Sequence, residues 1–379
     1  MALAINFEEI PSPSFVIDLP KLEDNARILS EIQRESGCHV LLALKGFACS
    51  DTFPMLKKYL SGTAASGLHE AILGSTRFGG EVHVCGPAYP DSQIEGLLEH
   101  ATAITFNSFS QWQRFKGRVL AHSRKISCGI RVNPETSVAE TEIYNPCAPG
   151  SRLGSKLSAF KGQDLAGIEG LHVHALCQQN VDALQAVWEA VESRFGHLLP
   201  QMKWLNLGGG HHITRSDYDR ATLIKLLKSI KEKYNLQVIL EPGEAVGLNA
   251  GYLMTSVEDI LEDSPAIAVL DTSATTHMPD VLEMPYRPEI IGAGLANEKR
   301  FTYLLGGMSC LAGDRIGAYS FEQPLQIGQR LVFTDMAIYS MVKTTTFNGV
   351  PLPSITTWDG KSTKFVKQFG YEDFADRLG

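Results

Sequence analysis

Short apolar runs alternate with amphipathic helical patterns over the part of the chain that precedes Gly251. Runs this short and apolar, bounded by glycine or polar residues, are typical of strands that are buried on both faces of a parallel sheet. Eight of them end, in order, at Lys45, Ser66, Gly86, Asn107, Asn133, Leu176, Gly208 and Glu241. Helical patterns such as Val181 to Phe195 and Tyr218 to Tyr234 lie between most of these strands. The alternation predicts a (β/α)8 barrel of the TIM type.

After Gly251 the pattern changes to short β-like runs that are separated by glycine, proline and polar clusters. These runs are Tyr252 to Ile260, Ile267 to Asp271, Phe301 to Leu305 and Gln329 to Thr334. The N-terminal run Phe15 to Asp18 has no place in the barrel, so we expect it to complete this second sheet. The expected domains are a barrel over residues 20–250 and a β-rich domain made of residues 1–19 with 251–379.

The position of a glycine cluster favours the barrel over an open doubly wound sheet. A doubly wound sheet normally has a glycine-rich turn after its first strand. Here the first strand of the barrel ends in Leu44-Lys45-Gly46-Phe47, and Gly208-Gly209-Gly210 follows the seventh strand. Loops after strands seven and eight of such barrels often present backbone N–H groups to a phosphate. A tight turn alone would also explain the three glycines. Only their position after the seventh strand favours a phosphate site.

The composition narrows the range of partners. The chain has 379 residues, 44% of them hydrophobic and 20% charged, as in a globular protein with a sizeable core. The formal net charge of -8 and the pI near 5.8 argue against nucleic acid and anionic membranes, so we expect a small-molecule ligand. No apolar run reaches the ~18 residues of a membrane span, and no basic N-terminal segment is visible, so we expect a cytoplasmic protein. The seven cysteines lack C-x-x-C spacing, which fits reduced thiols better than disulfides or a metal site.

Polar residues gather at the predicted strand ends, which meet at one face of a barrel. They are Lys45, Ser66, Asn133, His172, His174, Gly208 to Gly210 and Glu241. A lysine and a carboxylate that face an anion-binding loop indicate a cofactor with a phosphate and a carbonyl group. Pyridoxal phosphate fits best, because Lys45 would form the imine, Gly208 to Gly210 would hold the phosphate, and Glu241 would lie by the ring nitrogen. A carboxylate there keeps the ring protonated, so that the ring can accept the electrons of an α-carbanion.

Six motifs, read in chain order, resemble the alanine-racemase-fold pyridoxal-phosphate decarboxylases, the family that includes ornithine and diaminopimelate decarboxylases. The motifs are Leu42-Ala43-Leu44-Lys45, His172-Val173-His174, Gly208-Gly209-Gly210, Glu241-Pro242-Gly243, Cys310-Leu311-Ala312-Gly313-Asp314 and Ala337-Ile338-Tyr339. Together they span nearly the whole chain. The resemblance implies a pyridoxal-phosphate-dependent carboxy-lyase that works as a homodimer.

The resemblance also implies a role for each matching residue near the cofactor. Lys45 would form the Schiff base with pyridoxal phosphate, and His172 would stack on its ring. Gly208 to Gly210 and Tyr339 would hold the phosphate. Glu241 would bind the pyridinium nitrogen.

Two further matching residues concern the substrate. Cys310 would return a proton to the α-carbon after carbon dioxide leaves, and members of the family lend this cysteine across a homodimer interface. Asp314 would face the substrate. Catalysis would therefore need Lys45 from one subunit and Cys310 from the other.

One run narrows the resemblance to the carboxynorspermidine/carboxyspermidine decarboxylases. It is His277-Met278-Pro279-Asp280-Val281-Leu282-Glu283-Met284-Pro285-Tyr286-Arg287-Pro288, taken together with Glu244. The resemblance implies decarboxylation of carboxynorspermidine and carboxyspermidine to norspermidine and spermidine in polyamine biosynthesis. The related decarboxylases have arginine, which suits an anionic group, where this chain has Glu244. A glutamate favours a cationic amine instead.

This difference leads to a hypothesis about substrate recognition. Glu244, with Asp314 and Asp271, would bind the ammonium groups of the substrate, and Arg287 would bind its carboxylate. His277 is a further candidate contact with the substrate, although packing would also explain it.

Four other functions are alternatives to this one. A barrel metal hydrolase would use His172 and His174, but such enzymes usually place this pair on their first strand. A pyridoxal-phosphate-binding protein without catalysis is disfavoured by the β-rich domain and by Cys310. A racemase is disfavoured by Glu241, because a fully protonated ring promotes side reactions. Decarboxylation of ornithine or diaminopimelate stays the nearest alternative.

Overall fold

The computed structural model describes residues 5–136, 138 and 142–379, and the chain forms two compact units. Asn25–Lys45 and Ser50–Val246 form the first unit, which contains a closed barrel. The second unit consists of Met1–Asp24, Gly46–Cys49 and Gly247–Gly379 and contains a mixed sheet. The predicted barrel and the β-rich sheet with its N-terminal strand are therefore confirmed. The domain limits at 20–250 and at 1–19 with 251–379 stay a prediction.

Eight parallel strands close the barrel, because the last strand, β9, pairs with the first, β2. The strands are β2 (His39–Ala43), β3 (Gly62–Ala65), β4 (Glu81–Cys85), β5 (Ala103–Phe106), β6 (Ser127–Arg131), β7 (Gly170–His172), β8 (Trp204–Asn206) and β9 (Gln237–Leu240). At the closing pair, Val40 lies opposite Leu240. Nearly all strand residues are buried, as short apolar runs predict. Because the strands are parallel, their carboxyl ends form one rim.

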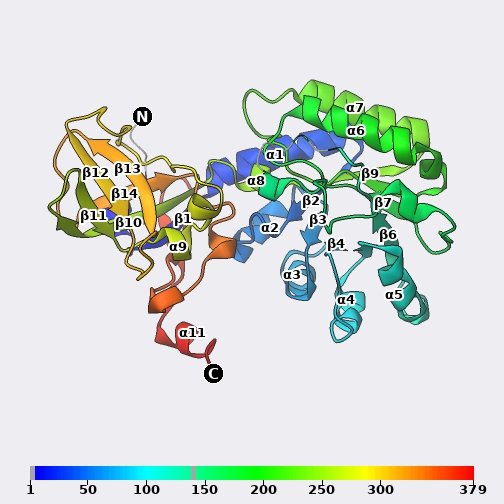
Figure 1. The fold of residues 1–379 in the computed structure, drawn as a ribbon, viewed down its shortest axis with the longest axis horizontal. Helices are drawn as coiled ribbons and strands as arrows, with labels where there is room; N and C mark the ends of the chain where they lie inside the picture. The colour runs from blue at the N-terminus through cyan, green and yellow to red at the C-terminus, as the bar shows by residue number, and fades with distance from the viewer. Residues whose placement is uncertain (1–4, 137, 139–141) are drawn as a thin grey trace. The chain divides into compact units, whose positions relative to one another are not determined.

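Helices surround the barrel strands, as Figure 1 shows for α3 to α7. The helices are α1 (Leu19–Ser36), α2 (Phe53–Leu56), α3 (Leu68–Leu73), α4 (Ile94–His100), α5 (Phe109–Ala121), α6 (Val181–Phe195), α7 (Arg220–Tyr234) and α8 (Glu244–Gly247). Side-chain caps fix several ends: Ser108 accepts the N–H of Gln111 at the start of α5, and Asp219 accepts that of Thr222 at the start of α7. Among the described residues, no helix has both the length and the apolar character that a membrane span requires.

Trp204 of β8 packs in the interior of the barrel with buried side chains from β2, β3 and β9. A Cβ atom at Gly129 would lie 2.3 Å from the indole, and one at Gly170 would lie 2.0 Å from it. The indole Nε1 donates to Ser127 Oγ at 2.8 Å. Glycine at positions 129 and 170 thus makes room for one large side chain, since a close-packed interior has no spare volume.

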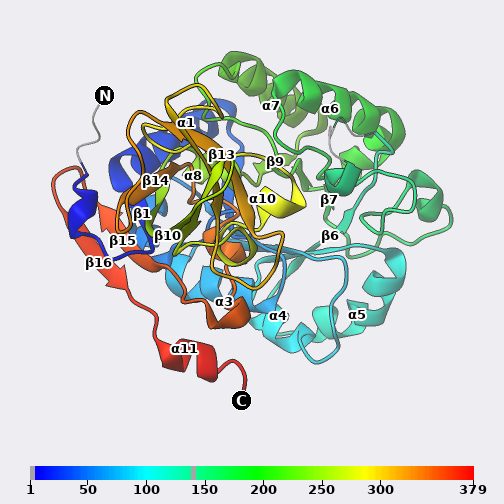
Figure 2. The same ribbon diagram turned by 60° about the vertical axis from the view of Figure 1, so that its left-hand side comes forward.

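The second unit is built on a mixed sheet in the order β13-β12-β11-β10-β1-β15-β16, with β14 also paired to β10. Its strands are β1 (Ser14–Asp18), β10 (Gly251–Leu261), β11 (Ala266–Leu270), β12 (Phe301–Gly306), β13 (Arg315–Phe321), β14 (Arg330–Thr334), β15 (Ser354–Trp358) and β16 (Thr363–Lys367). Figure 2 shows β1 beside β15 and β10, and the pairing is parallel with β15 and antiparallel with β10. The N-terminal strand therefore lies inside the sheet, between two strands that follow the whole barrel in the sequence.

Short helices and one main hydrophobic cluster complete the second unit. The helices are α9 (Ala274–His277), α10 (Asp280–Glu283) and α11 (Tyr371–Ala375). Phe15 of β1, Leu253 of β10, Tyr319 of β13 and Phe333 of β14 belong to the cluster. Burial of such large apolar side chains is the main force that holds the sheet and its short helices together.

The barrel strands end one to four residues earlier than predicted, and for two of them this changes where candidate residues lie. The strand predicted to end at Lys45 ends at Ala43, and the strand predicted to end at Leu176 ends at His172. Lys45 and His174 therefore lie in the loops beyond the strands. The strands β13, β15 and β16 were not predicted, because their runs contain polar or glycine residues. The partner of β15 in the sheet, β1, also lies at the other end of the sequence.

Candidate active site

Lys45 lies in a cavity at the carboxyl rim of the barrel, two residues beyond the end of β2. The cavity is lined by Ala43, Lys45, Ala64, Ala65, Ser66, Cys85, Arg131, His172, His174 and Glu241. The structure thus brings together most of the polar residues that the sequence placed on this face. Asn133 has a different environment, because it is buried and its Nδ2 donates to the carbonyl oxygen of Leu153 at 3.2 Å.

A line of hydrogen bonds joins Cys85, His172 and Glu241. Cys85 Sγ lies 3.5 Å from His172 Nδ1, and His172 Nε2 lies 3.3 Å from Glu241 Oε2. Burial alone would lower the pKa of His172, but the negative charges of Cys85 and Glu241 raise that pKa to about 9. Burial alone would raise the pKa of Glu241, but His172 holds it at about 2. The two side chains are therefore an imidazolium and a carboxylate at neutral pH.

Asn206 links this line to the glycine loop that follows β8. Its Nδ2 donates to Glu241 Oε1 at 2.7 Å, and its Oδ1 accepts the N–H of Gly208 at 2.8 Å. Both carboxylate oxygens of Glu241 thus have a donor, which fixes the orientation of the carboxylate. Asn206 was not among the residues predicted for the site, although its position at the end of β8 was a usable signal.

His174 contacts Lys45, a contact that was not predicted from the sequence. His174 Nε2 lies 3.3 Å from Lys45 Nζ, and His174 Nδ1 accepts the N–H of Gly209 at 3.1 Å. Desolvation by the surrounding protein lowers the pKa of Lys45. It also lowers the pKa of His174 well below its usual value, with a further contribution from the charge of Lys45. The lowered pKa of Lys45 favours the neutral amine, which is the form in which a lysine acts as a nucleophile.

The glycine loop has a backbone that only glycine accommodates. Gly208 and Gly210 have φ angles of 70° and 88°, in the left-handed region that side chains disfavour. A Cβ atom at Gly209 would lie 2.1 Å from the carbonyl oxygen of Glu241, and one at Gly210 would lie 2.1 Å from that of Leu176. Tight packing thus explains the three glycines, and phosphate binding by their N–H groups stays a prediction.

Glu244, at the start of α8, belongs to a polar cluster near the glycine loop. Its Oε1 accepts from Gln178 Nε2 at 3.0 Å and lies 3.9 Å from His212 Nδ1. Gln178 has a φ angle of 56°, which is unusual for a residue other than glycine. The carboxylate is part of a defined hydrogen-bonded cluster, and its predicted role in binding substrate amines remains untested.

In the second unit, Cys310 is exposed, whereas Asp314 is buried. The backbone N–H of Cys310 donates to Asn348 Oδ1 at 2.7 Å. Asp314 Oδ2 accepts from Ser273 Oγ at 2.8 Å and from Ser309 Oγ at 2.6 Å. Asp314 therefore holds together the loop that carries Cys310, and this contact does not depend on a substrate.

The other predicted substrate residues of the second unit also have partners within it. Asp271 Oδ1 accepts from Thr255 Oγ1 at 2.6 Å, within a buried cluster. His277 is 0% exposed, and its Nε2 donates to the carbonyl oxygen of Pro351 at 3.0 Å. Arg287 lies over the ring of Tyr319, with its guanidinium carbon 4.3 Å from the ring centre. These contacts give each residue a structural role, and their substrate roles stay predictions.

Tyr339 has a φ angle of 51°, in the left-handed region. Its backbone N–H donates to the carbonyl oxygen of Gly46 at 2.9 Å, and Gly46 follows Lys45 in the sequence. A strained backbone at a residue other than glycine costs ~1–3 kcal/mol and persists only where the surroundings impose it. The position of Tyr339 is therefore specified by the fold, whereas its predicted contact with a phosphate is not tested.

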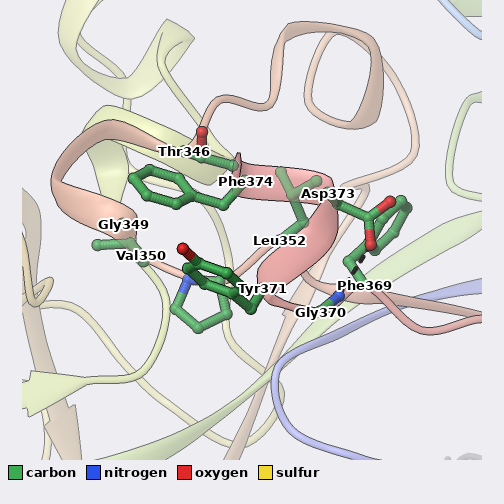
Figure 3. A pocket seen from close by; sticks show the side chains of 10 residues that line it. Thr346, Gly349, Val350, Leu352, Phe369, Gly370, Tyr371, Asp373 and Phe374 are labelled. Atoms are coloured by element: carbon green, nitrogen blue, oxygen red, sulfur yellow. Dashed lines mark hydrogen bonds between the residues drawn. The ribbon is translucent and has the colours of Figure 1, made fainter. Parts of the chain in front are cut away.

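A second hollow, of about 390 Å³, lies in the second unit between α11 and the segment that precedes β15. Figure 3 shows Phe374 and Tyr371 of α11 facing Thr346, Gly349 and Val350 of that segment. None of the predicted site residues lines this hollow. The barrel cavity therefore remains the candidate active site.

The side chains of the barrel cavity fit a cofactor that carries a carbonyl group and a basic ring nitrogen. The lowered pKa of Lys45 favours the neutral amine, the form of a lysine that adds to a carbonyl. Glu241 is ionised and held in place by two donors, so it can keep a ring nitrogen protonated. His172 contacts Glu241, whereas His174 contacts Lys45. These separate contacts do not favour a shared metal ion, which a metal hydrolase would need.

Comparison with known proteins identifies the group to which this site belongs. The family model described as "Pyridoxal-dependent decarboxylase, C-terminal sheet domain" matches residues 14–337. The chain belongs to this family. The predicted cofactor and enzyme class are therefore confirmed: the protein is a decarboxylase that depends on pyridoxal phosphate.

Two curated relatives match the decarboxylase over almost its whole length. The carboxynorspermidine/carboxyspermidine decarboxylase of Campylobacter jejuni is 43% identical, over 98% of this chain and 99% of its own. The carboxyaminopropylagmatine decarboxylase of a Synechocystis species is 44% identical, over 98% of this chain and 96% of its own. The resemblance to carboxynorspermidine/carboxyspermidine decarboxylases, found from the motifs, is thus confirmed. The names of the two relatives give different substrates.

Solved structures agree with this assignment. The crystal structure of carboxynorspermidine decarboxylase from Campylobacter jejuni, complexed with norspermidine, has a TM-score of 0.91 and 41% identity, and the match covers 97% of this chain and 100% of that one. The diaminopimelate decarboxylase of Helicobacter pylori has a TM-score of 0.83 at 16% identity, with 98% of each chain covered. The second match shows the shared fold alone.

Removing the charge of Glu241 should lower the pKa of His172. In the Glu241→Gln variant, we expect the pKa of His172 to fall from about 9 by at least about one unit. Burial lowers this pKa, and the variant lacks the negative charge of Glu241 that raises it. The pKa of the His172 ring is measured by NMR titration of the cofactor-free protein. The Glu70→Gln variant is the control, since Glu70 accepts from the backbone of Ser66 and not from His172. An unchanged His172 titration in Glu241→Gln would contradict the charge pairing.

The same pairing predicts how stability depends on pH. The folded pKa of His172, about 9, exceeds the ordinary value of 6.5, so its contribution to stability is complete below pH 6.5 and is lost as the pH rises through 9. Chemical unfolding of the wild type should show this alkaline loss. The loss should be smaller in Glu241→Gln.

Proposed function

We propose that this decarboxylase removes carbon dioxide from carboxynorspermidine or carboxyspermidine and so forms norspermidine or spermidine. The observation that carries the proposal is the nearly full-length similarity to the Campylobacter jejuni decarboxylase that was solved with norspermidine. The cavity that contains Lys45, His172 and Glu241 supports it, because these residues suit a decarboxylation that depends on pyridoxal phosphate.

Carboxyaminopropylagmatine is a second candidate substrate, because the Synechocystis relative that decarboxylates it is 44% identical to this chain. The two kinds of substrate differ at the end remote from the reacting carbon. A carboxylated polyamine ends in an ammonium group, whereas an agmatine derivative ends in a planar guanidinium. An ammonium is a compact charge and a guanidinium binds as a fork, so the residue that meets this end decides between them.

Pyridoxal phosphate, when bound, withdraws electrons from the α-carbon of the substrate and so permits the carboxylate to leave. Lys45 would attach to its carbonyl carbon, and His172 would stack on its ring. Gly208 to Gly210, with Tyr339, would hold its phosphate. Glu241 would keep the ring nitrogen protonated, and Asn206 would hold the carboxylate in place for that task.

The proton that replaces the lost carboxylate would come from Cys310. Its side chain is exposed on the single chain, so it is available to a second copy. We propose a homodimer in which each subunit supplies Lys45 to one site and Cys310 to the other. A twofold axis would make the two sites identical.

The ammonium groups of the substrate would be bound by acidic side chains. Glu244 is the first candidate, because Gln178 already holds its carboxylate and because it begins α8 directly after Glu241-Pro242-Gly243. Arg287 would bind a carboxylate of the substrate, and Asp271, His277 and Asp314 would complete the substrate site. Asp271, His277 and Asp314 are held by hydrogen bonds within the second unit. They would therefore bind the substrate without changing their conformation.

The purified enzyme should release carbon dioxide most efficiently from a carboxylated polyamine. We expect the highest kcat/KM with carboxynorspermidine or carboxyspermidine, measured beside carboxyaminopropylagmatine, ornithine and diaminopimelate. The Lys45→Ala variant should lose at least about a thousandfold in turnover, because it lacks the amine that reacts with the carbonyl. A clear preference for ornithine or diaminopimelate would refute the proposed substrate class, and a preference for the agmatine derivative would select the second candidate.

Neutralising Glu244 should weaken substrate binding. The Glu244→Gln variant should raise KM for carboxynorspermidine about tenfold with little change in kcat, since a charge-assisted hydrogen bond is lost from both the ground state and the transition state. Glu244→Arg should raise KM further. Glu232→Gln, on the exposed face of α7, is the matched control. A KM that stays unchanged in both Glu244 variants would rule out contact with the substrate.

Mixing two inactive variants tests whether the active site is shared. Hybrids of Lys45→Ala and Cys310→Ala subunits would contain one site with both residues intact. Because half of randomly assembled dimers are hybrids, the mixture should recover about a quarter of wild-type turnover. If Cys310 acted in its own subunit, every site of a hybrid would lack one residue and turnover would not recover.

A further inference from the structure

His174 is held between two elements of the barrel rim. Its Nδ1 lies 3.1 Å from the backbone nitrogen of Gly209, and its Nε2 lies 3.3 Å from Lys45 Nζ. A Cβ atom at Gly208 would lie 2.6 Å from the same Nδ1, so the loop passes directly against the ring. One imidazole therefore connects the glycine loop to the lysine.

The backbone contact decides which ring nitrogen carries the proton. A backbone N–H can only donate, so the Nδ1 atom that faces Gly209 must be the unprotonated nitrogen. In a neutral imidazole the proton is then on Nε2, which faces Lys45. Nε2–H can only donate to Lys45 if Nζ offers a lone pair. The geometry therefore requires Lys45 to be a neutral amine, because a charged ammonium has no lone pair.

We propose that His174 is a positioning residue that joins the glycine loop to Lys45 and holds this lysine as a free amine. The inference rests on the proposed function only in taking Lys45 as the reactive lysine. It adds that the loop, through the N–H of Gly209, selects the tautomer that makes the lysine nucleophilic. At every stage of the reaction in which Lys45 carries a free amine, His174 would orient its lone pair.

The charged groups around Lys45 differ in their effect on its pKa, and none of those that the structure describes forms a hydrogen bond to its lone pair as His174 does. Desolvation by the surrounding protein is the largest influence on the pKa of Lys45, and it lowers that pKa. Glu241, Cys85 and Glu70 raise it, whereas Arg131 lowers it. Three groups thus favour the ammonium, against burial and one arginine. A directed hydrogen bond to the lone pair favours the amine specifically, and this is the contribution of His174.

Two variants of His174 separate its two contacts. The side-chain amide of asparagine corresponds in reach to Nδ1, and that of glutamine corresponds to Nε2. His174→Asn should therefore keep an acceptor for the N–H of Gly209 and lose the contact with Lys45. His174→Gln should keep a donor for Lys45 and lose the contact with Gly209. The two changes are similar in size, so each is a control for the other.

Both contacts can be measured in the cofactor-free full-length protein. The state of Lys45 is measured by trace acetylation with acetic anhydride as a function of pH, quantified at Lys45 by peptide mass spectrometry. The contact of Gly209 is measured by hydrogen–deuterium exchange of its backbone amide. His174→Asn should react about fivefold more slowly at Lys45 at neutral pH with unchanged exchange at Gly209. His174→Gln should show the opposite result, about fivefold faster exchange with unchanged acetylation.

The His211→Asn variant is a control for the loss of a buried histidine. His211 follows the glycine loop, and its Nδ1 contacts Tyr218 Oη at 2.7 Å rather than Lys45. This variant should leave acetylation of Lys45 as in the wild type. The inference is overturned if His174→Asn and His174→Gln change both measurements together, or if neither variant changes either one.

A separate measurement tests the proposed function itself. Reduction with borohydride in the presence of pyridoxal phosphate should attach the cofactor to Lys45 of the wild type, as identified by peptide mass spectrometry. If the cofactor attaches to Lys45 while the His174 variants behave like the wild type, the proposed function stands and the inference about His174 fails. If the cofactor attaches elsewhere while the variants separate as expected, the function fails and the contact stands.

Discussion

The pairing of β9 with β2 is the constraint on which the active site depends. Lys45, Cys85, His172 and Glu241 follow or end four different strands, and these strands are far apart in the sequence. Only a closed ring of parallel strands sets all their carboxyl ends around one cavity. Because the strands are buried and the helices outside them are capped, the side chains start from a rigid rim. Catalytic groups need such support to keep their geometry.

Within this cavity, partners rather than burial alone decide which groups carry charge. His172 and His174 are two residues apart, and the surrounding protein disfavours the charged form of both. Glu241 and Cys85 nevertheless raise the pKa of His172 to about 9, whereas the pKa of His174 falls well below its usual value, with Lys45 as its neighbour. One motif thus supplies a cation beside the carboxylate and a neutral ring beside the lysine. These are different tasks, and the sequence pattern His-x-His does not distinguish them.

The second unit uses acidic and basic side chains mainly to fix its own loops. Asp271, Asp314 and His277 are buried and have hydrogen-bond partners, so their geometry is set before any substrate arrives. Cys310 is exposed on a loop that Asp314 holds through Ser309. A buried carboxylate with several donors is a stable anchor, since unpaired buried charges are costly. Such an anchor fixes the loop that carries Cys310.

The sequence by itself was enough to predict the barrel, the β-rich sheet and the cofactor, and to select two residues of the barrel cavity, Lys45 and Glu241. Alternating apolar runs and helical patterns fix a barrel, because buried parallel strands have few other solutions. Lys45 and Glu241 also stood out, since charged residues rarely end core strands without a reason. Only the tertiary structure placed Asn206 and Cys85 beside Glu241 and His172, and brought His174 to Lys45. Those contacts depend on where each strand ends and on the path of each loop, to within a few ångströms. The periodicity of the sequence does not specify either.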